Sequence, residues 1–241
     1  MSRLRERTIQ LKAVEELRKF YFRKEGNENI YSAIEVRTRK EKGNKRADGI
    51  ICFETKNKEI FTVSLEAKSH KTLGDLTSLI SDDKIIIQSL VVSAIITFSA
   101  ITTLAILLNL QWYYLSIIGL GTFAAFFILA FWLLDKLDLD NHKIISVIEQ
   151  LKQYPANEQW IAYSTYTDNL LSSVTSNFKK NHLQILDSLC NKNGFGLMLI
   201  GNKTAKILYE PKFKKGYYLN NYCKEDTIKE FLKTGISLKS K

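Results

Sequence analysis

Two long stretches in the middle of the chain contain no charged residue. Residues 85–108 and 114–134 lack Asp, Glu, Lys and Arg, and only the short uncharged connection "NLQWYY" joins them. Lys84 lies just before the first stretch, and Asp135 and Lys136 lie just after the second. Each stretch is long enough to cross a hydrocarbon core as a helix, which takes about 20 residues. The pattern predicts a two-helix transmembrane hairpin, and the alternative is a buried helical hairpin of a soluble protein.

A hairpin returns the chain to the side of the membrane that it left. Lys and Arg are frequent on both flanks, whereas the connection between the two stretches is neutral. By the positive-inside rule, we expect a multi-pass protein of the inner (cell) membrane with both flanking segments in the cytoplasm. The N-terminal residues have no apolar core of the kind that a signal peptide needs, and the three widely spaced cysteines suit a reducing compartment.

The polar flanks carry hydrophobic patterns of their own. Helical spacing predicts helices, and alternation or short apolar runs predict strands, with "TKNK" as the turn of a hairpin. The first flank is expected to form a helix over 7–24 and strands over 29–39, 46–54 and 59–68. The second flank is expected to form helices over 142–154 and 169–193 and strands over 159–164, 195–201 and 205–211.

Neither flank makes a complete domain alone, because the first has one helix for three strands and the second has helices with only short strands to cover. We therefore expect one α/β domain built from residues 1–80 and 141–241. The hairpin, over residues 81–140, is inserted between the third strand and the next helix. An insertion whose two ends lie close together leaves the surrounding domain intact.

The net charge of +10 and the pI of about 9.3 favour an anionic partner. Two basic stretches, "RTRKEKGNKR" and "KFKKGYY", suit either a nucleic-acid backbone or an anionic lipid surface. In the first stretch the predicted nucleic-acid contacts are Arg37, Arg39, Lys45 and Arg46. The flanks contain no Gly-rich phosphate loop, and no Ser-His-Asp order is supported.

Three charged residues of the predicted hairpin form a candidate metal site. Glu66 and Lys68 are two residues apart on one strand, so their side chains share a face. A turn centred within "TKNK" places Asp48 opposite Leu65 and diagonal to Glu66. Two neighbouring carboxylates repel each other unless a cation lies between them, and Mg²⁺ (or Mn²⁺) binds well to one or two carboxylates. The alternative is a solvated charge cluster.

The arrangement Asp48-x17-Glu66-Ala-Lys68, on strands that follow an N-terminal helix, resembles the PD-(D/E)XK nuclease superfamily, also called the restriction-endonuclease-like fold. The resemblance implies a central mixed sheet flanked by helices. It also implies that Asp48 and Glu66 bind the metal ion and that Lys68 assists the nucleophilic water. Here "RAD" stands where the family name has "PD", and that proline is variable in the superfamily.

The resemblance implies further site residues on two helices. Members of the family often carry another Glu on the first helix, and Glu16 is preferred over Glu15 because it shares a helical stripe with Ala13. Some members place Gln-x3-Tyr on the helix after the Glu-x-Lys strand. Gln150 and Tyr154 match that spacing and are expected to contact nucleic acid.

The sequence therefore predicts a membrane-anchored, metal-dependent endonuclease that hydrolyses phosphodiester bonds, with DNA as the expected substrate and a role in defence against foreign DNA; the choice between DNA and RNA stays open. Two sites are needed to cut both strands, which suits a homodimer. The competing hypothesis is a non-enzymatic membrane module. Its hairpin would oligomerise, form a pore or recruit a partner, while an inactive nuclease-like domain senses or binds nucleic acid.

Overall fold

The computed structural model describes residues 3–108, 111–137, 143–173 and 182–235, and the chain divides into two compact units. Unit 1 comprises Met1–Ser78 and Ile145–Lys241, and unit 2 comprises Leu79–Ile144. Unit 2 thus interrupts unit 1 in the sequence, close to the insertion predicted over residues 81–140. Each unit is described by itself.

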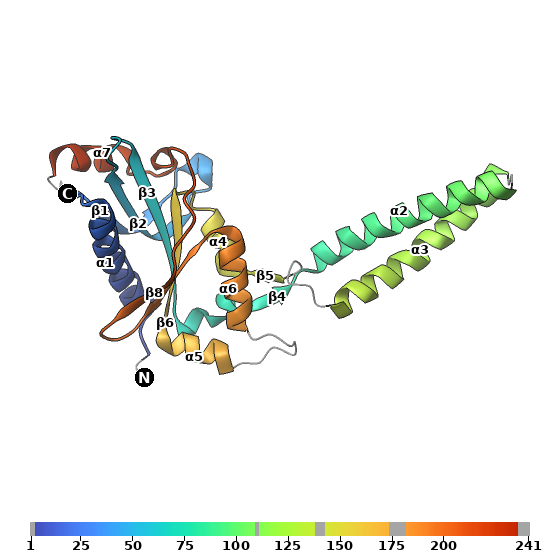
Figure 1. The fold of residues 1–241 in the computed structure, drawn as a ribbon, viewed down its shortest axis with the longest axis horizontal. Helices are drawn as coiled ribbons and strands as arrows, with labels where there is room; N and C mark the ends of the chain where they lie inside the picture. Colours follow the sequence, from blue (N-terminus) through green and yellow to red (C-terminus); the bar gives the residue numbers. More distant parts are fainter. Residues whose placement is uncertain (1–2, 109–110, 138–142, 174–181, 236–241) are drawn as a thin grey trace. The chain divides into compact units, whose positions relative to one another are not determined.

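A mixed six-stranded sheet with the order β1-β2-β3-β6-β7-β8 forms the centre of unit 1 (Figure 1). β3 pairs with β6 and β6 with β7 in parallel, and the other neighbours are antiparallel. All seven residues of β6 are buried, as expected for a parallel strand in the middle of a covered sheet. The strands are β1 (Tyr31–Arg37), β2 (Arg46–Glu54), β3 (Ile60–Lys68), β6 (Glu158–Ser164), β7 (Gly196–Ile200) and β8 (Ala205–Tyr209).

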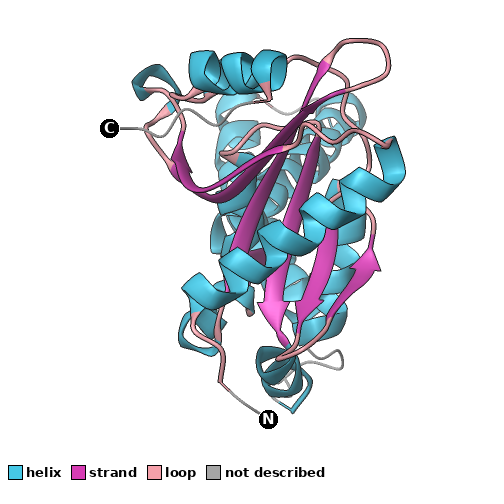
Figure 2. Ribbon diagram, turned by 90° about the vertical axis from the view of Figure 1, so that its left-hand side faces the viewer, coloured by secondary structure: helices cyan, strands magenta, loops and turns pink. Residues whose placement is uncertain are grey.

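Helices lie on both faces of this sheet (Figure 2). α1 (Glu6–Glu25) covers one face through Ile9, Ala13, Leu17 and Tyr21, which recur every four residues and are all buried. The helix ends at Gly26, whose φ of 68° allows its N–H to donate to the carbonyl of Phe22. The side chain of Tyr21 also donates to the buried carboxylate of Glu158 on β6, which fixes the helix against the sheet.

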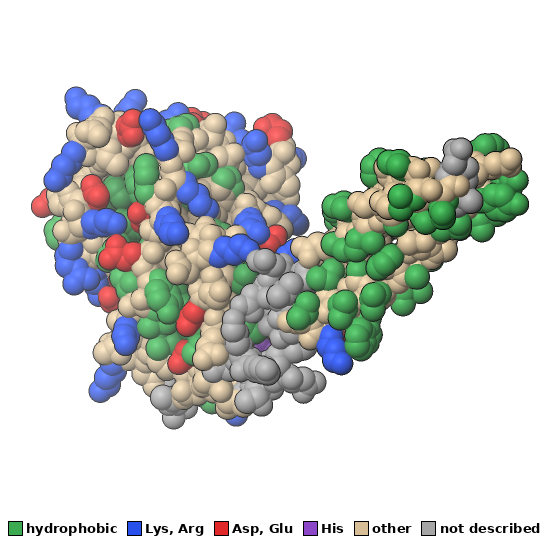
Figure 3. Space-filling view, turned by 45° about the vertical axis from the view of Figure 1, so that its right-hand side comes forward, with side chains coloured by type: hydrophobic (Ala, Val, Ile, Leu, Met, Phe, Trp, Pro, Cys, Tyr) green, Lys and Arg blue, Asp and Glu red, His purple; other side chains and the backbone are tan. Residues whose placement is uncertain are grey.

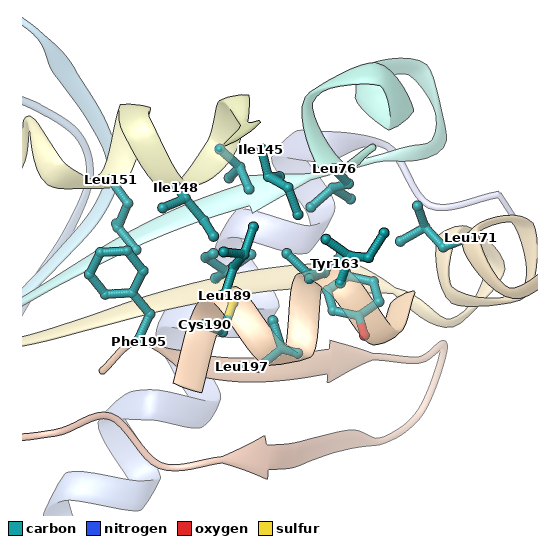
Figure 4. Packing of buried hydrophobic residues seen from close by; sticks show 14 of the residues in the cluster. Leu76, Ile145, Ile148, Leu151, Tyr163, Leu171, Leu189, Cys190, Phe195 and Leu197 are labelled. Atoms are coloured by element: carbon teal, nitrogen blue, oxygen red, sulfur yellow. The ribbon is translucent and has the colours of Figure 1, made fainter. Parts of the chain in front are cut away.

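The opposite face is covered by α4 (Ser146–Lys152) and α6 (His182–Asn193). Figure 4 shows Ile148 and Leu151 of α4 and Leu189 and Cys190 of α6 packed against residues of the strands. A third cluster joins β1 and β2 to α7 (Glu225–Thr234). The shorter elements of the chain are η1 (Lys40–Lys42), η2 (His70–Leu76), β4 (Ser78–Ile80), β5 (Lys143–Ile145), α5 (Thr165–Ser173) and η4 (Leu219–Asn221).

The structure confirms an α/β architecture with a mixed sheet flanked by helices, and it corrects three elements. The helix predicted over 142–154 is shorter, because β5 occupies Lys143–Ile145 and α4 begins at Ser146; residue 142 lies outside the described residues. The helix predicted over 169–193 is observed as α5 and α6, and residues 174–181 are not described. α7 was not predicted, although its sequence is amphipathic and ends at Gly235 with a φ of 68°.

Unit 2 contains two apolar helices, α2 (Asp82–Leu108) and α3 (Trp112–Leu137), which pack against each other. Both are long and apolar enough to cross a membrane, and only 11% and 6% of their most apolar windows are buried. Hydrophobic side chains cover both helices in Figure 3. Within the described chain these helices are therefore not core helices, which leaves their apolar surface for a lipid or protein environment.

Candidate metal and nuclease site

The ladders on both sides of β2 are interrupted at Asp48. On one side, Ile34 pairs with Gly49 and Val36 with Ala47, so the ladder with β1 skips Asp48 and then continues. On the other side, the described ladder with β3 ends where Gly49 faces Leu65. The position opposite Asp48 on β1 is Glu35, whose φ of 55° is unusual for a residue other than glycine. This local break leaves backbone groups near Asp48 without ladder partners, and one of them, the N–H of Ala67, binds the Asp48 carboxylate.

The observed register corrects the prediction that Asp48 lies opposite Leu65. Leu65 faces Gly49, so one further step of the register brings Asp48 level with Glu66. The reason lies in the turn, where the N–H of Thr55 donates to the carbonyl of Glu59 (2.8 Å) and Lys58 adopts a left-handed conformation with a φ of 62°. A three-residue turn of this kind is one residue longer than a two-residue turn.

The Asp48 carboxylate is bound on two sides. One oxygen accepts a hydrogen bond from the backbone N–H of Ala67 (2.8 Å), in place of a ladder bond from β2. The other oxygen accepts from the side-chain amide of Gln10 on α1 (2.8 Å). Only 7% of Asp48 is exposed, and these two bonds hold its carboxylate beside the strand that carries Glu66.

Glu66 and Lys68 share one face of β3, as predicted, and are both 5% exposed. The Lys68 ammonium lies 3.0 Å from Glu66 Oε1, 2.9 Å from Asp75 Oδ2 and 2.7 Å from Gln150 Oε1. An ammonium group has three N–H donors, so protein oxygens can occupy all of them. By contrast, Glu66 Oε2 is buried and has no hydrogen-bond partner in the described chain.

Burial raises the pKa of both carboxyl groups, to about 6 for Asp48 and about 7 for Glu66. The charge of Asp48 adds to the increase at Glu66, while Lys68 opposes it. For Lys68 itself, burial opposes the charged form, but the charges of Glu66 and Asp75 raise its pKa. The site therefore holds two desolvated acids that resist simultaneous ionisation at neutral pH, beside a stable positive charge.

Glu16 was predicted to join this site, but the structure places it elsewhere on α1. Glu16 lies 3.0 Å from Lys19 on a solvent-accessible part of α1, since it is one residue, or about 100°, away from the buried stripe position Leu17. The helix instead presents Glu6 and Gln10, which are four residues apart. The charge of Glu6 raises the pKa of both Asp48 and Glu66, and its carboxylate accepts a hydrogen bond from Thr72 (2.9 Å).

Gln150 and Tyr154 lie at the site, on and just after α4. Gln150 accepts a hydrogen bond from Lys68, and its amide donates to Ser146 Oγ (3.2 Å). Tyr154 is 6% exposed, and burial followed by the charges of Glu66 and Asp48 raises its pKa to about 12. Both side chains therefore lie next to the two buried acids and do not form part of an exposed basic surface.

The four predicted basic contacts lie in different surroundings. Arg37 and Arg46 are exposed and directly opposite each other on β1 and β2, and the charge of Arg46 lowers the pKa of Asp48. Lys45 is exposed next to them. Arg39 forms an ion pair with Glu225 (2.6 Å), so its charge is already compensated within the protein.

The residues present fit a hard divalent cation such as Mg²⁺. Glu66 Oε2 is a buried oxygen with no hydrogen-bond partner among the described residues, and each Asp48 oxygen keeps a lone pair beyond its one hydrogen bond. No group of three or more His, Cys, Asp or Glu side chains in the described residues could hold a metal. The protein would therefore supply two carboxylates, and water and phosphate oxygens would complete the coordination that Mg²⁺ prefers.

Sequence reasoning missed Glu6, Gln10 and Asp75. Glu6 and Gln10 had a usable signal, because both lie within one turn of the buried Ile9 at the start of the helix. Asp75 had none, since it lies in η2, which carries no regular hydrophobic pattern. The chain matches no family model, no curated protein and no solved structure.

Proposed function

We propose that this chain is a membrane-anchored, metal-dependent nuclease of the restriction-endonuclease-like class. The observation that carries the proposal is the juxtaposition of Asp48, Glu66 and Lys68 at the break in the β2–β3 ladder. Two buried carboxylates with raised pKa values, next to an ammonium group, are the groups that metal-assisted phosphodiester hydrolysis requires.

Each residue has a distinct role in this proposal. Asp48 and Glu66 would hold Mg²⁺ or Mn²⁺, with Asp48 oriented by Ala67 and Gln10. The chemistry that such an ion would supply there is compensation of phosphate charge and a lower pKa for a water molecule, which could then act as the nucleophile. Lys68, 3.0 Å from Glu66, supplies positive charge to the developing phosphorane. Both carboxyl groups must lose their protons before they hold the ion, so binding of Mg²⁺ to the metal-free protein should weaken as the pH falls below about 7.

The surface beside the site supports nucleic acid as the substrate. Arg37 and Arg46 face each other across two strands, and like charges in this position repel unless an anion lies between or over them. Glu35 offsets only part of this charge, at 3.7 Å from Arg46. Lys45 extends the basic surface. A phosphate backbone is the anionic partner that fits a row of exposed cations, and we propose DNA as the polymer.

The two apolar helices support a location at the cell membrane, with unit 1 in the cytoplasm by the charge of the flanks. Tethering would restrict cleavage to nucleic acid near the lipid surface, such as DNA that has just entered the cell. A defence against foreign DNA follows from this location together with the chemistry. Two copies in the same membrane would supply the two sites that double-strand cleavage needs.

The test is a cleavage assay on the purified full chain in detergent with Mg²⁺ or Mn²⁺. Linear, circular and single-stranded DNA, together with RNA, are compared as substrates. Asp48→Asn and Lys68→Met are each expected to lower the cleavage rate by at least about 100-fold. Lys203→Ala, which removes an exposed Lys far along the chain from the site, is expected to cleave normally. Equal rates in all four proteins would refute the nuclease proposal, and so would equal absence of cleavage.

One observation favours the non-enzymatic alternative. All three donors of Lys68 already have protein acceptors, so a substrate must displace Asp75 or Gln150 before it can use this charge. An inactive domain that binds nucleic acid would retain this closed arrangement. Such a domain would cleave nothing in the assay above. In a gel-shift assay it would bind DNA, and the Lys68→Met variant would bind with the same affinity as the wild type.

A further inference from the structure

The stretch "KFKKGYY" borders an open cavity of about 670 Å³ at the end of the sheet where β3 begins. The cavity is separate from the metal site, because Phe61 on its wall and Glu66 are five residues apart on β3, or about 17 Å at the rise of a strand. None of the residues assigned to the metal site lines it. The principal lining side chains are Lys58, Phe61, Phe213, Lys215, Tyr217 and Lys229.

Aromatic rings form one part of the wall. Phe213 is 58% exposed and stacks on Phe61, with ring centroids 5.8 Å apart and planes at 18°; Phe61 stacks in turn on the buried Phe53 at 4.9 Å. The chain on both sides of Phe213 is fixed, because the N–H groups of Lys212 and Lys214 donate to backbone carbonyls at 3.0 and 2.8 Å. The outer ring of the stack is thus held in place while most of it remains exposed.

Tyr217 adds a second exposed ring, 45% exposed, whose hydroxyl donates to Glu225 (2.9 Å). Both rings therefore have fixed orientations in the protein before any ligand is bound. A flat aromatic group gains most from a platform that is already ordered, because little side-chain entropy is lost on binding.

Positive charge forms the other part of the wall. Lys58 and Lys215 are exposed, and in the described chain neither ammonium group has a hydrogen-bond or ion-pair partner. Lys229 also lines the cavity but is paired with Glu225 at 2.7 Å. Glu59 is the acidic side chain among the described lining residues. The two free cations leave a net positive charge beside the rings, which suits an anion attached to an aromatic group.

We propose that this cavity binds a nucleotide, with the base against Phe213 and Tyr217 and a phosphate beside Lys58 and Lys215. The nucleotide is either free or part of a single strand, since both present the same base and phosphate. Stacking of a base on an aromatic side chain is worth about 1–3 kcal/mol and is tolerant of sequence. Anionic lipid headgroups would also explain the lysines, but rings that line the wall of a cavity suit one flat ligand better than the surface of a lipid bilayer.

The experiment uses the full chain in nanodiscs of neutral phosphatidylcholine with EDTA, so that cleavage is absent and anionic lipid is excluded. A fluorescent AMP derivative is titrated by anisotropy, and unlabelled AMP, oligothymidylate and inorganic phosphate compete with it. We expect saturable binding that Phe213→Ala weakens at least about 10-fold. Lys58→Ala and Lys215→Ala should weaken binding and reduce its dependence on salt.

Matched controls are Phe22→Ala, which removes a ring that is 48% exposed on α1, and Lys203→Ala; both should bind as the wild type does. Stronger competition by AMP assigns the site to free nucleotides, and stronger competition by oligothymidylate assigns it to strands. The proposal is overturned if neither competes, if phosphate alone competes as well as AMP, or if Phe213→Ala binds normally. In a second arm, the unlabelled protein is mixed with phosphatidylglycerol vesicles, and binding to these vesicles without any binding of AMP also overturns it. Because EDTA removes the cation, this result is independent of the cleavage assay.

Discussion

Glu66 is expected to destabilise the folded protein at neutral pH, so that Glu66→Gln stabilises unit 1 while it removes a proposed metal ligand. The side chain is 5% exposed, its Oε2 atom has no hydrogen-bond partner among the described residues, and Asp48 adds a second negative charge nearby. Glutamine has nearly the same shape without the charge. Lys68 keeps Asp75 and Gln150 as partners in this variant.

The magnitude follows from the pKa. The pKa of Glu66 rises from its usual value of 4.5 to about 7, and each pH unit of difference corresponds to about 1.4 kcal/mol. Ionised Glu66 therefore costs roughly 3 kcal/mol relative to the neutral form, and the amide recovers about 1–3 kcal/mol because its own hydrogen bonds are imperfect. For a unit of this size, that is a rise in Tm of about 3–10 °C.

The sign of the pH dependence is fixed by the same shift. A carboxyl group with a raised pKa binds its proton more tightly in the folded state, so its contribution to stability is fully present below pH 4.5 and is lost as the pH rises through about 7. Wild-type protein should lose stability over this range. The advantage of Glu66→Gln should be largest near pH 8 and absent near pH 4.

Near-ultraviolet circular dichroism provides a suitable assay at both pH 4 and pH 8, because the buried rings of Tyr21, Trp160 and Tyr163 in unit 1 lose their fixed surroundings on unfolding. Thermal unfolding of the full chain in detergent is followed with and without Mg²⁺, and Glu15→Gln, whose side chain is 66% exposed, serves as the control. Mg²⁺ should raise the Tm of the wild type at pH 8 but not that of Glu66→Gln. A lower Tm for Glu66→Gln at pH 8, or an equal gain at both pH values, would refute the reasoning.

Two further predictions test neighbouring groups. Because the charge of Glu6 raises the pKa of both site acids, Glu6→Gln should move the midpoint pH of Mg²⁺ binding to a lower value, whereas Glu16→Gln should leave it unchanged. Calorimetric titrations over a pH series measure this midpoint. Equal midpoints in both variants would exclude Glu6 from the site. Because the charge of Asp75 raises the pKa of Lys68, Asp75→Asn should move the alkaline limb of the cleavage pH profile to lower pH, and an unmoved limb would show that Lys68 does not limit the reaction.

Much of the fold could be predicted from hydrophobic pattern, for a physical reason. β2, β3 and α1 are regular over nine or more residues; β2 and β3 bury long consecutive apolar runs, and α1 buries one stripe of positions. α4 is only seven residues long and follows a short strand, so its helical pattern could not be separated from that of its neighbours. Elements this short depend on the packing of the whole sheet rather than on their own sequence.

The site shows the same limit at the level of single residues. The spacing of Glu66 and Lys68 alone predicted their common face, because alternation in a strand is strict. The one-residue error at Asp48 came from the left-handed φ of Lys58, a conformation that lysine seldom adopts and that no local pattern announces. The prediction for Glu16 failed because Glu16 lies one helical position away from the buried stripe of α1. The hydrophobic pattern of a single amphipathic helix does not separate stripes that lie this close together.

The insertion point has a consequence for the site. Lys68 is bound by Asp75, just before unit 2 begins, and by Gln150, just after it ends, although Gln150 is 82 residues further along the chain than Lys68. The pairing of β4 with β5 brings the two ends of the insertion together, so the strand and the helix can meet as if the chain were continuous. Asp75 and Gln150, the acceptors of Lys68 other than Glu66, therefore both belong to segments that lead into or out of the hairpin.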